Sequence, residues 1–221
     1  MKRLQLAGFL LAMTLGISGC AAPLTTYTQT PPEAYAPYTG KVFDASFDTV
    51  WAAVVASVEA GGFALDAVSR DTGSITLSFS VDDPAGYIDC GAVIFTTDDQ
   101  AETVRKAGKH AMFTVWSGGP TGQPARRDAT LAGKATLVLT KEGDGRTAVT
   151  VSAQYAASFA ERYARWAPVN GTGVYQMHVA ETDVTFTTGQ TGTSEDGNTE
   201  CVTKYALEQK LLDGIATTLG K

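Results

Sequence analysis

The sequence is poor in the residues that build metal sites and lacks the motifs of two common enzyme classes. Two histidines and three cysteines among 221 residues leave little material for a zinc cluster. Neither a GxSxG elbow nor a GxxxxGK[ST] loop is present, so lipase-like and P-loop chemistry have no motif support. We therefore predict no metal and no cofactor.

An excess of positive charge is also absent. The chain carries 17 Lys and Arg against 23 Asp and Glu, a formal net charge of -6. Nucleic-acid-binding proteins usually present a basic face, so this balance argues against a nucleic-acid partner. Hydrophobic residues make up 44% and charged residues 18% of the sequence, which is ordinary globular composition and excludes a disordered or collagen-like chain.

The first twenty residues lack a hydrophobic run long enough to cross a bilayer as a stable helix. A basic start is followed by an uncharged apolar stretch from Leu4 to Ile17 and by small residues, an order typical of a secretory signal peptide. The segment Ile17-Ser18-Gly19-Cys20 resembles the bacterial lipobox, which implies cleavage before Cys20 and a lipid on its thiol. We therefore predict a lipoprotein signal peptide over residues 1–19; a plain signal peptide followed by a chance cysteine is the alternative.

Ala21 follows the predicted acylation site. In Gram-negative lipoproteins, Asp at this position commonly signals retention in the inner membrane, so Ala21 implies sorting to the outer membrane, with the folded part facing the periplasm. The acylated Cys20 would anchor the protein to that membrane. Residues 20–40 are rich in proline and lack apolar periodicity, so we expect an extended tether that reaches up to about 60 Å from the lipid. The alternative is that its tyrosines pack back on the domain: Tyr27, Tyr35 and Tyr38.

Two cysteines remain once Cys20 is acylated. Export places Cys90 and Cys201 in an oxidising compartment, where an even number of cysteines favours a disulfide. They lie 111 residues apart, and closing so long a loop stabilises a fold by roughly 4–5 kcal/mol in the chain-entropy model. Asp89-Cys90-Gly91 is also faintly similar to the nucleophile turn of NlpC-type cysteine peptidases, with His178 as the required base. A cell-wall peptidase that uses Cys90 is therefore the enzymatic alternative.

Hydrophobic periodicity predicts two helices and several strands. Helical spacing of apolar residues predicts a helix over 46–60, with Ser46 or Asp44 as its cap, and a last helix from about residue 204 to 219. Period-two alternation predicts strands over these ranges: 63–67, 74–81, 131–140, 149–156 and 174–186, with 110–116 as a further candidate. Polar stretches are expected to be loops: 82–91, 96–102 and 117–128.

The order of helix, strands and helix, with short hairpin-type connections, predicts an α+β fold. We expect an antiparallel sheet of about five or six strands with the N-terminal and C-terminal helices packed on one face, in a single domain over 41–221. The stretch FDASFDTVWAAVVASVEAGGFALDAVSRDTGSITLSFS resembles the opening of the helix-grip domains in BamC-like outer-membrane lipoproteins. The resemblance covers about residues 41–81 and 201–219. It implies a non-enzymatic accessory protein of the cell envelope, with no catalytic residue.

One stretch combines arginines with aromatic residues on this acidic chain: Arg162, Tyr163, Arg165 and Trp166. Such residues are enriched where interfaces bind tightly. We expect a connection at the end of the sheet that serves as an interaction surface for an envelope protein; the alternative is that Trp166 plugs the core. The predicted function is a binding or assembly module, and the alternatives are the peptidase and a carrier of an apolar ligand gripped between sheet and helix.

Overall fold

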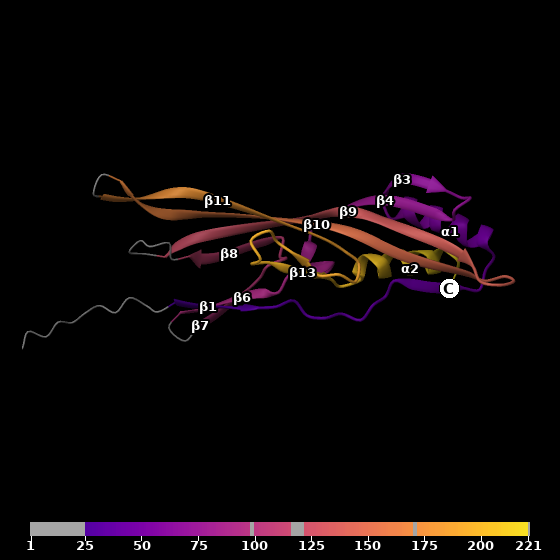
Figure 1. Ribbon diagram of the computed structural model, residues 1–221, viewed down its shortest axis with the longest axis horizontal. Helices are drawn as coiled ribbons and strands as arrows, with labels where there is room; N and C mark the ends of the chain where they lie inside the picture. Colours follow the sequence, from indigo (N-terminus) through magenta and orange to yellow (C-terminus); the bar gives the residue numbers. More distant parts are fainter. Residues whose placement is uncertain (1–24, 98–99, 116–121, 170–171, 221) are drawn as a thin grey trace, which may run out of the picture.

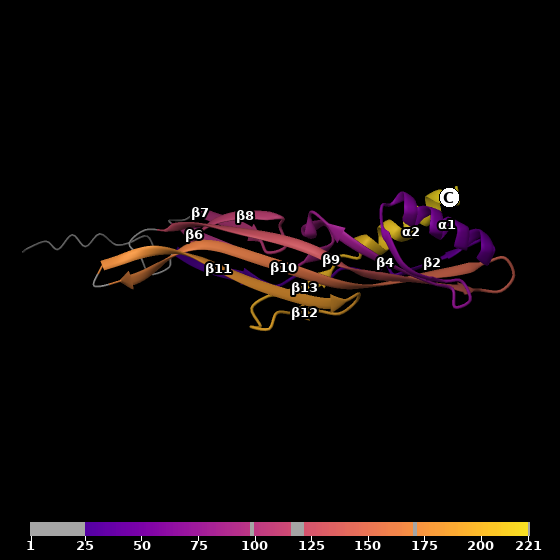
Figure 2. The ribbon, with the colours of Figure 1, turned by 90° about the horizontal axis from the view of Figure 1, so that it is seen from above.

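The computed structural model describes residues 25–97, 100–115, 122–169 and 172–220. The protein is elongated, and both helices lie towards one end of its long axis (Figures 1 and 2). The elements in chain order are β1 (Thr25–Thr30), β2 (Gly40–Phe43), α1 (Phe47–Ala60), β3 (Ala64–Ser69), β4 (Ser74–Val81), η1 (Pro84–Gly86), β5 (Ile88–Asp89), β6 (Ala92–Thr97), β7 (Gln100–Arg105), β8 (His110–Val115), β9 (Gln123–Lys141), β10 (Thr147–Val169), β11 (Thr172–Thr187), β12 (Gly192–Thr193), β13 (Glu200–Thr203) and α2 (Ala206–Thr218).

Two long strands run through the molecule and form its spine. β9 has 19 residues and β10 has 23, and they pair antiparallel from Ala125↔Tyr163 to Lys141↔Thr147. The seven-stranded sheet has the order β11-β10-β9-β4-β3, with β2 paired to the start of β10 and β8 to the start of β9. The strand alternation of β10 leaves odd-numbered residues buried up to residue 159, so one face of this sheet carries the core.

The half of the sheet that contains β2, β3 and β4 is covered on that face by both helices, and we call it the helix half (Figure 2). α1 begins after Ser46, whose Oγ accepts a hydrogen bond from the N–H of Thr49. The core between helices and sheet includes Val54, Leu137 and Leu212, all fully buried. Within the described ranges, neither helix is long and apolar enough to cross a membrane.

A buried carboxylate joins α2 to the sheet. Glu208 is fully buried, and its oxygens accept hydrogen bonds from the hydroxyls of Tyr155 (2.9 Å) and Thr188 (2.6 Å). Burial, and next the charge of Glu208, raise the pKa of Tyr155, so the phenol remains a donor. The two hydroxyls satisfy a group that would otherwise be costly to bury.

The other half of the seven-stranded sheet, which we call the arm half, contains β8, most of β11, and the adjoining parts of β9 and β10. Here a separate three-stranded sheet, β1-β6-β7, takes the place of the helices. The core between the two sheets is small and consists of Val104, Phe113 and Ala125. Phe95 stacks on Phe113 with ring centroids 5.3 Å apart. The two halves therefore share strands, but the helices cover one half and the small sheet covers the other.

The expected free tether over residues 20–40 is not what the structure shows from Thr25 onward. β1 pairs antiparallel with β6 along its whole length. The hydroxyl of Tyr35 donates to Asp89 (3.1 Å) and that of Tyr38 to Asp213 (3.3 Å), whereas Tyr27 is 70% exposed. The prolines of residues 31–39 interrupt pairing only between β1 and β2, so strand pairing and tyrosine contacts hold the segment against the protein.

The predicted fold class is wrong. Of the residues that the structure describes, strands make up 57% and helices 16%, in three sheets, so the fold is mostly β rather than an α+β fold with one helix-covered sheet of five or six strands. Both predicted helices are present as α1 and α2, and the predicted hairpin as β3 and β4. The error arose in polar stretches: residues 96–97 belong to β6, residues 100–102 to β7, and residues 123–128 to β9.

Candidate functional site on the arm half

The four residues of the predicted interaction surface lie within strand β10, not in a connection. Arg162, Tyr163, Arg165 and Trp166 occupy its last third, where β10 pairs with β11. Successive residues of a strand point to opposite faces, so the four divide into two pairs. Arg162 and Trp166 lie on the solvent face. Tyr163 and Arg165 lie on the other face, where Tyr163 packs against the small core.

A row of four side chains crosses the solvent face of the arm half. Met112 is paired with Arg126, Arg126 with Arg162, and Arg162 with Val179. Met112 is 59% exposed and Val179 48%. We call these four residues the base patch. It places two guanidinium groups between two exposed apolar side chains, a composition suited to binding another protein.

Asp128 holds the arginines of the base patch in place. Its carboxylate accepts hydrogen bonds from Nε of Arg126 (2.8 Å) and Nη1 of Arg162 (2.7 Å), and it lies 2.7 Å from Nδ1 of His110. The hydrogen bonds from Arg126 and then His110 lower the pKa of Asp128. One carboxylate shared by two arginines leaves a positive patch on a chain whose net charge is -6.

β10 and β11 continue beyond the end of their pairing with β9. The last pair between β9 and β10 is Ala125↔Tyr163, whereas the ladder between β10 and β11 runs on to Val169↔Thr172. We call residues 164–169 and 172–177 the distal hairpin. It projects at the end of the molecule opposite the helices (Figure 1).

The distal hairpin carries apolar side chains on both faces. On the solvent face, the rings of Trp166 and Tyr175 meet edge to face with centroids 4.9 Å apart, and Met177 is 73% exposed. On the other face, Ala167 is paired with Val174, which is 40% exposed. Trp166 belongs to neither hydrophobic core, so the alternative in which it plugs the core is wrong.

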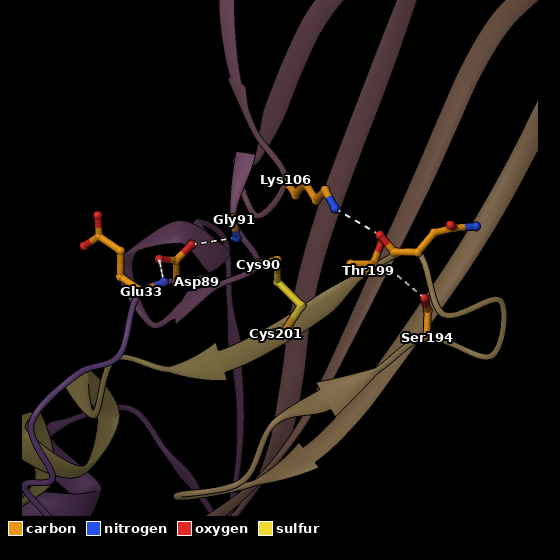
Figure 3. The surroundings of a disulfide bond; sticks show 9 residues. Glu33, Asp89, Cys90, Gly91, Lys106, Ser194, Thr199 and Cys201 are labelled. Atoms are coloured by element: carbon orange, nitrogen blue, oxygen red, sulfur yellow. Dashed lines mark hydrogen bonds between the residues drawn. A yellow bond between two sulfur atoms is a disulfide. The ribbon is translucent and has the colours of Figure 1, made fainter. Parts of the chain in front are cut away.

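The predicted disulfide between Cys90 and Cys201 is confirmed (Figure 3). It joins the turn after β5 to β13, and both cysteines are buried. Because the sulfur of Cys90 is bonded, it is not available as the nucleophile of a peptidase. His178, the base that such a peptidase would need, packs instead against Tyr163 in the arm half, with ring centroids 5.1 Å apart.

Asp89 binds the N-terminal segment beside this disulfide (Figure 3). Its carboxylate accepts hydrogen bonds from the N–H groups of Gly91 (2.8 Å) and Glu33 (3.0 Å) and from the hydroxyl of Tyr35 (3.1 Å). Burial alone would raise the pKa of Asp89, but the hydrogen bonds outweigh it and the pKa is lowered. Burial and then the hydrogen bond to Asp89 raise the pKa of Tyr35 to about 12. Gly91 has φ +72°, and a Cβ there would overlap the carbonyl oxygen of Thr30, so glycine permits this close approach.

A cavity of about 220 Å³ lies where the small sheet meets the arm half. Lys106 on its wall is only 6% exposed, and its Nζ donates to Oε1 of Gln29 (2.9 Å) and to the carbonyl of Asn198 (3.0 Å). Burial, and next the charge of Arg127, lower the pKa of Lys106. Arg127 in turn pairs with Glu161. Both cations thus have partners within the protein: Lys106 holds β1 and the loop before β13 against the turn after β7, and Arg127 joins β9 to β10.

Two further questions concern metal ions and lipid attachment. Across the described ranges, no three His, Cys, Asp or Glu side chains gather closely enough to hold a metal ion. Cys20, the predicted attachment site, lies outside the described residues.

No protein-family model matches the chain, and no curated protein is similar to it in sequence. What the base patch and the distal hairpin can bind therefore follows from their own chemistry.

Proposed function

We propose that the protein is an outer-membrane lipoprotein, acylated on Cys20, that acts as a non-enzymatic binding or assembly module of the cell envelope. The lipobox-like segment 17–20 supports the anchor, and Ala21 supports the outer membrane, with the folded part in the periplasm. The disulfide fits an oxidising compartment. The resemblance of the sequence over about residues 41–81 to BamC-like outer-membrane lipoproteins supports an accessory role in the envelope.

The base patch is the observation that carries the binding function. Arginine and methionine are enriched in the buried centres of protein interfaces, and this patch offers both on a flat, rigid sheet. Asp128 already fixes the two arginines, so a partner need not order them on binding. Its positive charge complements an acidic surface. The partner that this chemistry fits is an envelope protein whose contact surface has an acidic centre flanked by apolar side chains.

The peptidase alternative needs Cys90 as a free thiolate nucleophile, but Cys90 is bonded to Cys201 in the disulfide. The carrier alternative needs space for an apolar ligand between sheet and helix. In the helix half that space is filled by core side chains, among them Val54, Leu137 and Leu212, which have no exposed surface. A ligand there would have to displace them, at the cost of the packing that stabilises the fold.

Fatty-acid labelling tests the anchor. Cells that express the wild-type chain should yield labelled protein in the outer-membrane fraction, and Cys20→Ser should abolish the label and leave the precursor uncut. The double variant Cys90→Ser/Cys201→Ser is the matched control, since it removes two thiols and should keep the label. Mature Cys20→Ser protein that is cut between Gly19 and Cys20 would contradict the proposal.

Site-specific photo-crosslinking in intact cells tests the binding surface. A crosslinker in place of Met112 should give a discrete adduct with one envelope protein. The same crosslinker in place of Val42, which is 47% exposed in the helix half, should give none. Arg126→Gln/Arg162→Gln should lower the yield of the Met112 adduct several-fold. Equal adducts at the two positions, unaffected by the arginine substitutions, would refute the assignment of the base patch.

A further inference from the structure

We infer that the distal hairpin contacts the lipid bilayer beside the protein's own anchor, at the depth of the lipid headgroups. The inference rests on the acylation of Cys20 proposed above and names what this end of the protein binds. The arm half then has two binding surfaces: the base patch binds a protein partner, and the distal hairpin binds lipid.

The length of chain before β1 brings the bilayer to this end of the molecule. Four residues lie between Cys20 and Thr25, and the five residue-to-residue steps from one to the other span at most about 18 Å in a fully extended chain. β1 lies in the arm half, and the distal hairpin projects beyond it, away from the helices (Figure 1). Because residues from Thr25 on are fixed to the protein, no long tether separates the anchor from this end.

The charge distribution favours an anionic surface at the hairpin. Between Arg162 and Ala180 the sequence has two arginines and no Asp or Glu, although the whole chain has 23 acidic residues. Arg165 is exposed. Anionic lipid headgroups attract arginine near the surface, whereas they repel the acidic remainder of the protein. Both effects turn the hairpin towards the bilayer and the helix half away from it.

The apolar side chains match a lipid environment better than a protein partner. A protein docks on one face of a two-stranded hairpin, but this hairpin exposes apolar groups on both faces: Met177 on one, Val174 on the other. A bilayer surface can accept both faces at once. The adjacent rings of Trp166 and Tyr175 are of the two residue types that concentrate at membrane–water interfaces.

Backbone hydrogen bonding limits how deeply the distal hairpin enters the bilayer. Among the described strands, residues 167–169 of β10 and 172–174 of β11 pair in the ladder only with each other, so the outer edges of this two-stranded segment carry backbone N–H and C=O groups outside the ladder. Such edges are too costly to place in the hydrocarbon core. The hairpin therefore rests among the headgroups and does not span the membrane.

Fluorescence quenching by brominated lipid tests the contact. Full-length protein is purified from membranes and placed in vesicles of phosphatidylcholine and phosphatidylglycerol whose acyl chains carry bromine near the headgroup. The chain has three tryptophans: Trp51, Trp116 and Trp166. Trp51→Phe/Trp116→Phe retains only Trp166, and Trp116→Phe/Trp166→Phe retains only Trp51, the control in α1. We expect several-fold stronger quenching of Trp166 than of Trp51, and weaker quenching of Trp166 when Arg165→Gln is added.

Equal quenching of the two indoles, or none, overturns the inference. A crosslinker at Met177 in the otherwise unchanged chain gives an independent measurement if the tryptophan variants fold poorly. A phospholipid adduct supports the contact, and a protein adduct without lipid overturns it in favour of a second docking surface.

The mass of the purified protein reports acylation of Cys20 in the same preparation. A missing acyl group refutes the proposed anchor. In that case quenching of Trp166 on addition of the protein to the vesicles still supports the hairpin contact, and its absence overturns it.

Discussion

The helix half and the arm half are built on the same two strands, β9 and β10, yet they use them differently. In the helix half, one face of these strands is sealed by α1 and α2, and the core contains fully buried residues such as Leu137 and Leu212. In the arm half the cover is a small sheet over Val104, Phe113 and Ala125. The arm half instead exposes Met112, Met177 and fixed arginines. The helix half therefore holds the larger core, and the arm half holds the surface that we propose binds a partner.

A large loss of stability is expected when the disulfide is removed. Cys90→Ser/Cys201→Ser should lower the free energy of unfolding by roughly 4 kcal/mol, because the bridge closes a loop whose ends are 111 residues apart. Chemical denaturation measures the loss, and reduction of the wild-type protein should reproduce it. A loss near zero would mean that the packing around β5 and β13 holds these segments together without the bridge.

Leu137→Ala should cost somewhat less, roughly 3 kcal/mol, by leaving a cavity in the helix-half core. Leu137 is fully buried, whereas its neighbour Val138 is 38% exposed on the opposite face of β9. Val138→Ala is therefore the matched control and should change the free energy of unfolding by less than about 1 kcal/mol. Similar losses for the two variants in urea unfolding would show that the helices do not seal this face.

The sequence predicted the helix half better than the arm half, for a physical reason. Around Ile75 and Val149, large apolar residues face the helices and polar ones face water, so period-two alternation is visible. Around β9 residues 123–128, the inward positions are held by Gln123, Ala125 and Arg127, and the outward positions by Pro124, Arg126 and Asp128. The alternation is real there, but hydrophobicity does not reveal it, and these residues resemble a loop.

The site was predictable in part. Arg162, Tyr163, Arg165 and Trp166 were identified by composition; Arg165 and Trp166 lie on the distal hairpin, whereas Arg162 and Tyr163 lie where β10 still pairs with β9, and Tyr163 packs against the small core. Composition could not identify Met112, Asp128 and Val179, because they reach the base patch only through the register of β8, β9, β10 and β11. The disulfide needed no register, since the predicted export and the predicted acylation of Cys20 left one possible pairing.

A smaller loss of stability, which depends on pH, is expected when Asp89 is replaced. Hydrogen bonds lower its pKa in the folded protein, so its contribution to stability is present above the ordinary pKa of aspartate and is lost as the pH falls through the lower folded value. The melting temperature of the wild type should therefore fall between about pH 4 and pH 2 more steeply than that of Asp89→Asn. Asp144→Asn, at an exposed position in the turn between β9 and β10, is the control and should follow the wild type. Identical profiles for Asp89→Asn and the wild type would contradict the role of this carboxylate.

The smallest change in the free energy of unfolding is expected for the substitution of Trp166. The substitution of Trp51, in the helix half, provides the comparison. The indole of Trp166 contacts Tyr175 and covers Gly173, where a Cβ would overlap the ring, but all three residues belong to the distal hairpin. Trp166→Ala should therefore change the free energy of unfolding by no more than about 0.5 kcal/mol. Trp51 is 7% exposed and packs in the helix-half core, so Trp51→Ala should cost roughly 3–5 kcal/mol. Urea unfolding followed by circular dichroism measures both. Equal losses would mean that the distal hairpin is part of the cooperative core, and the division between a stabilising half and a binding half would then be wrong.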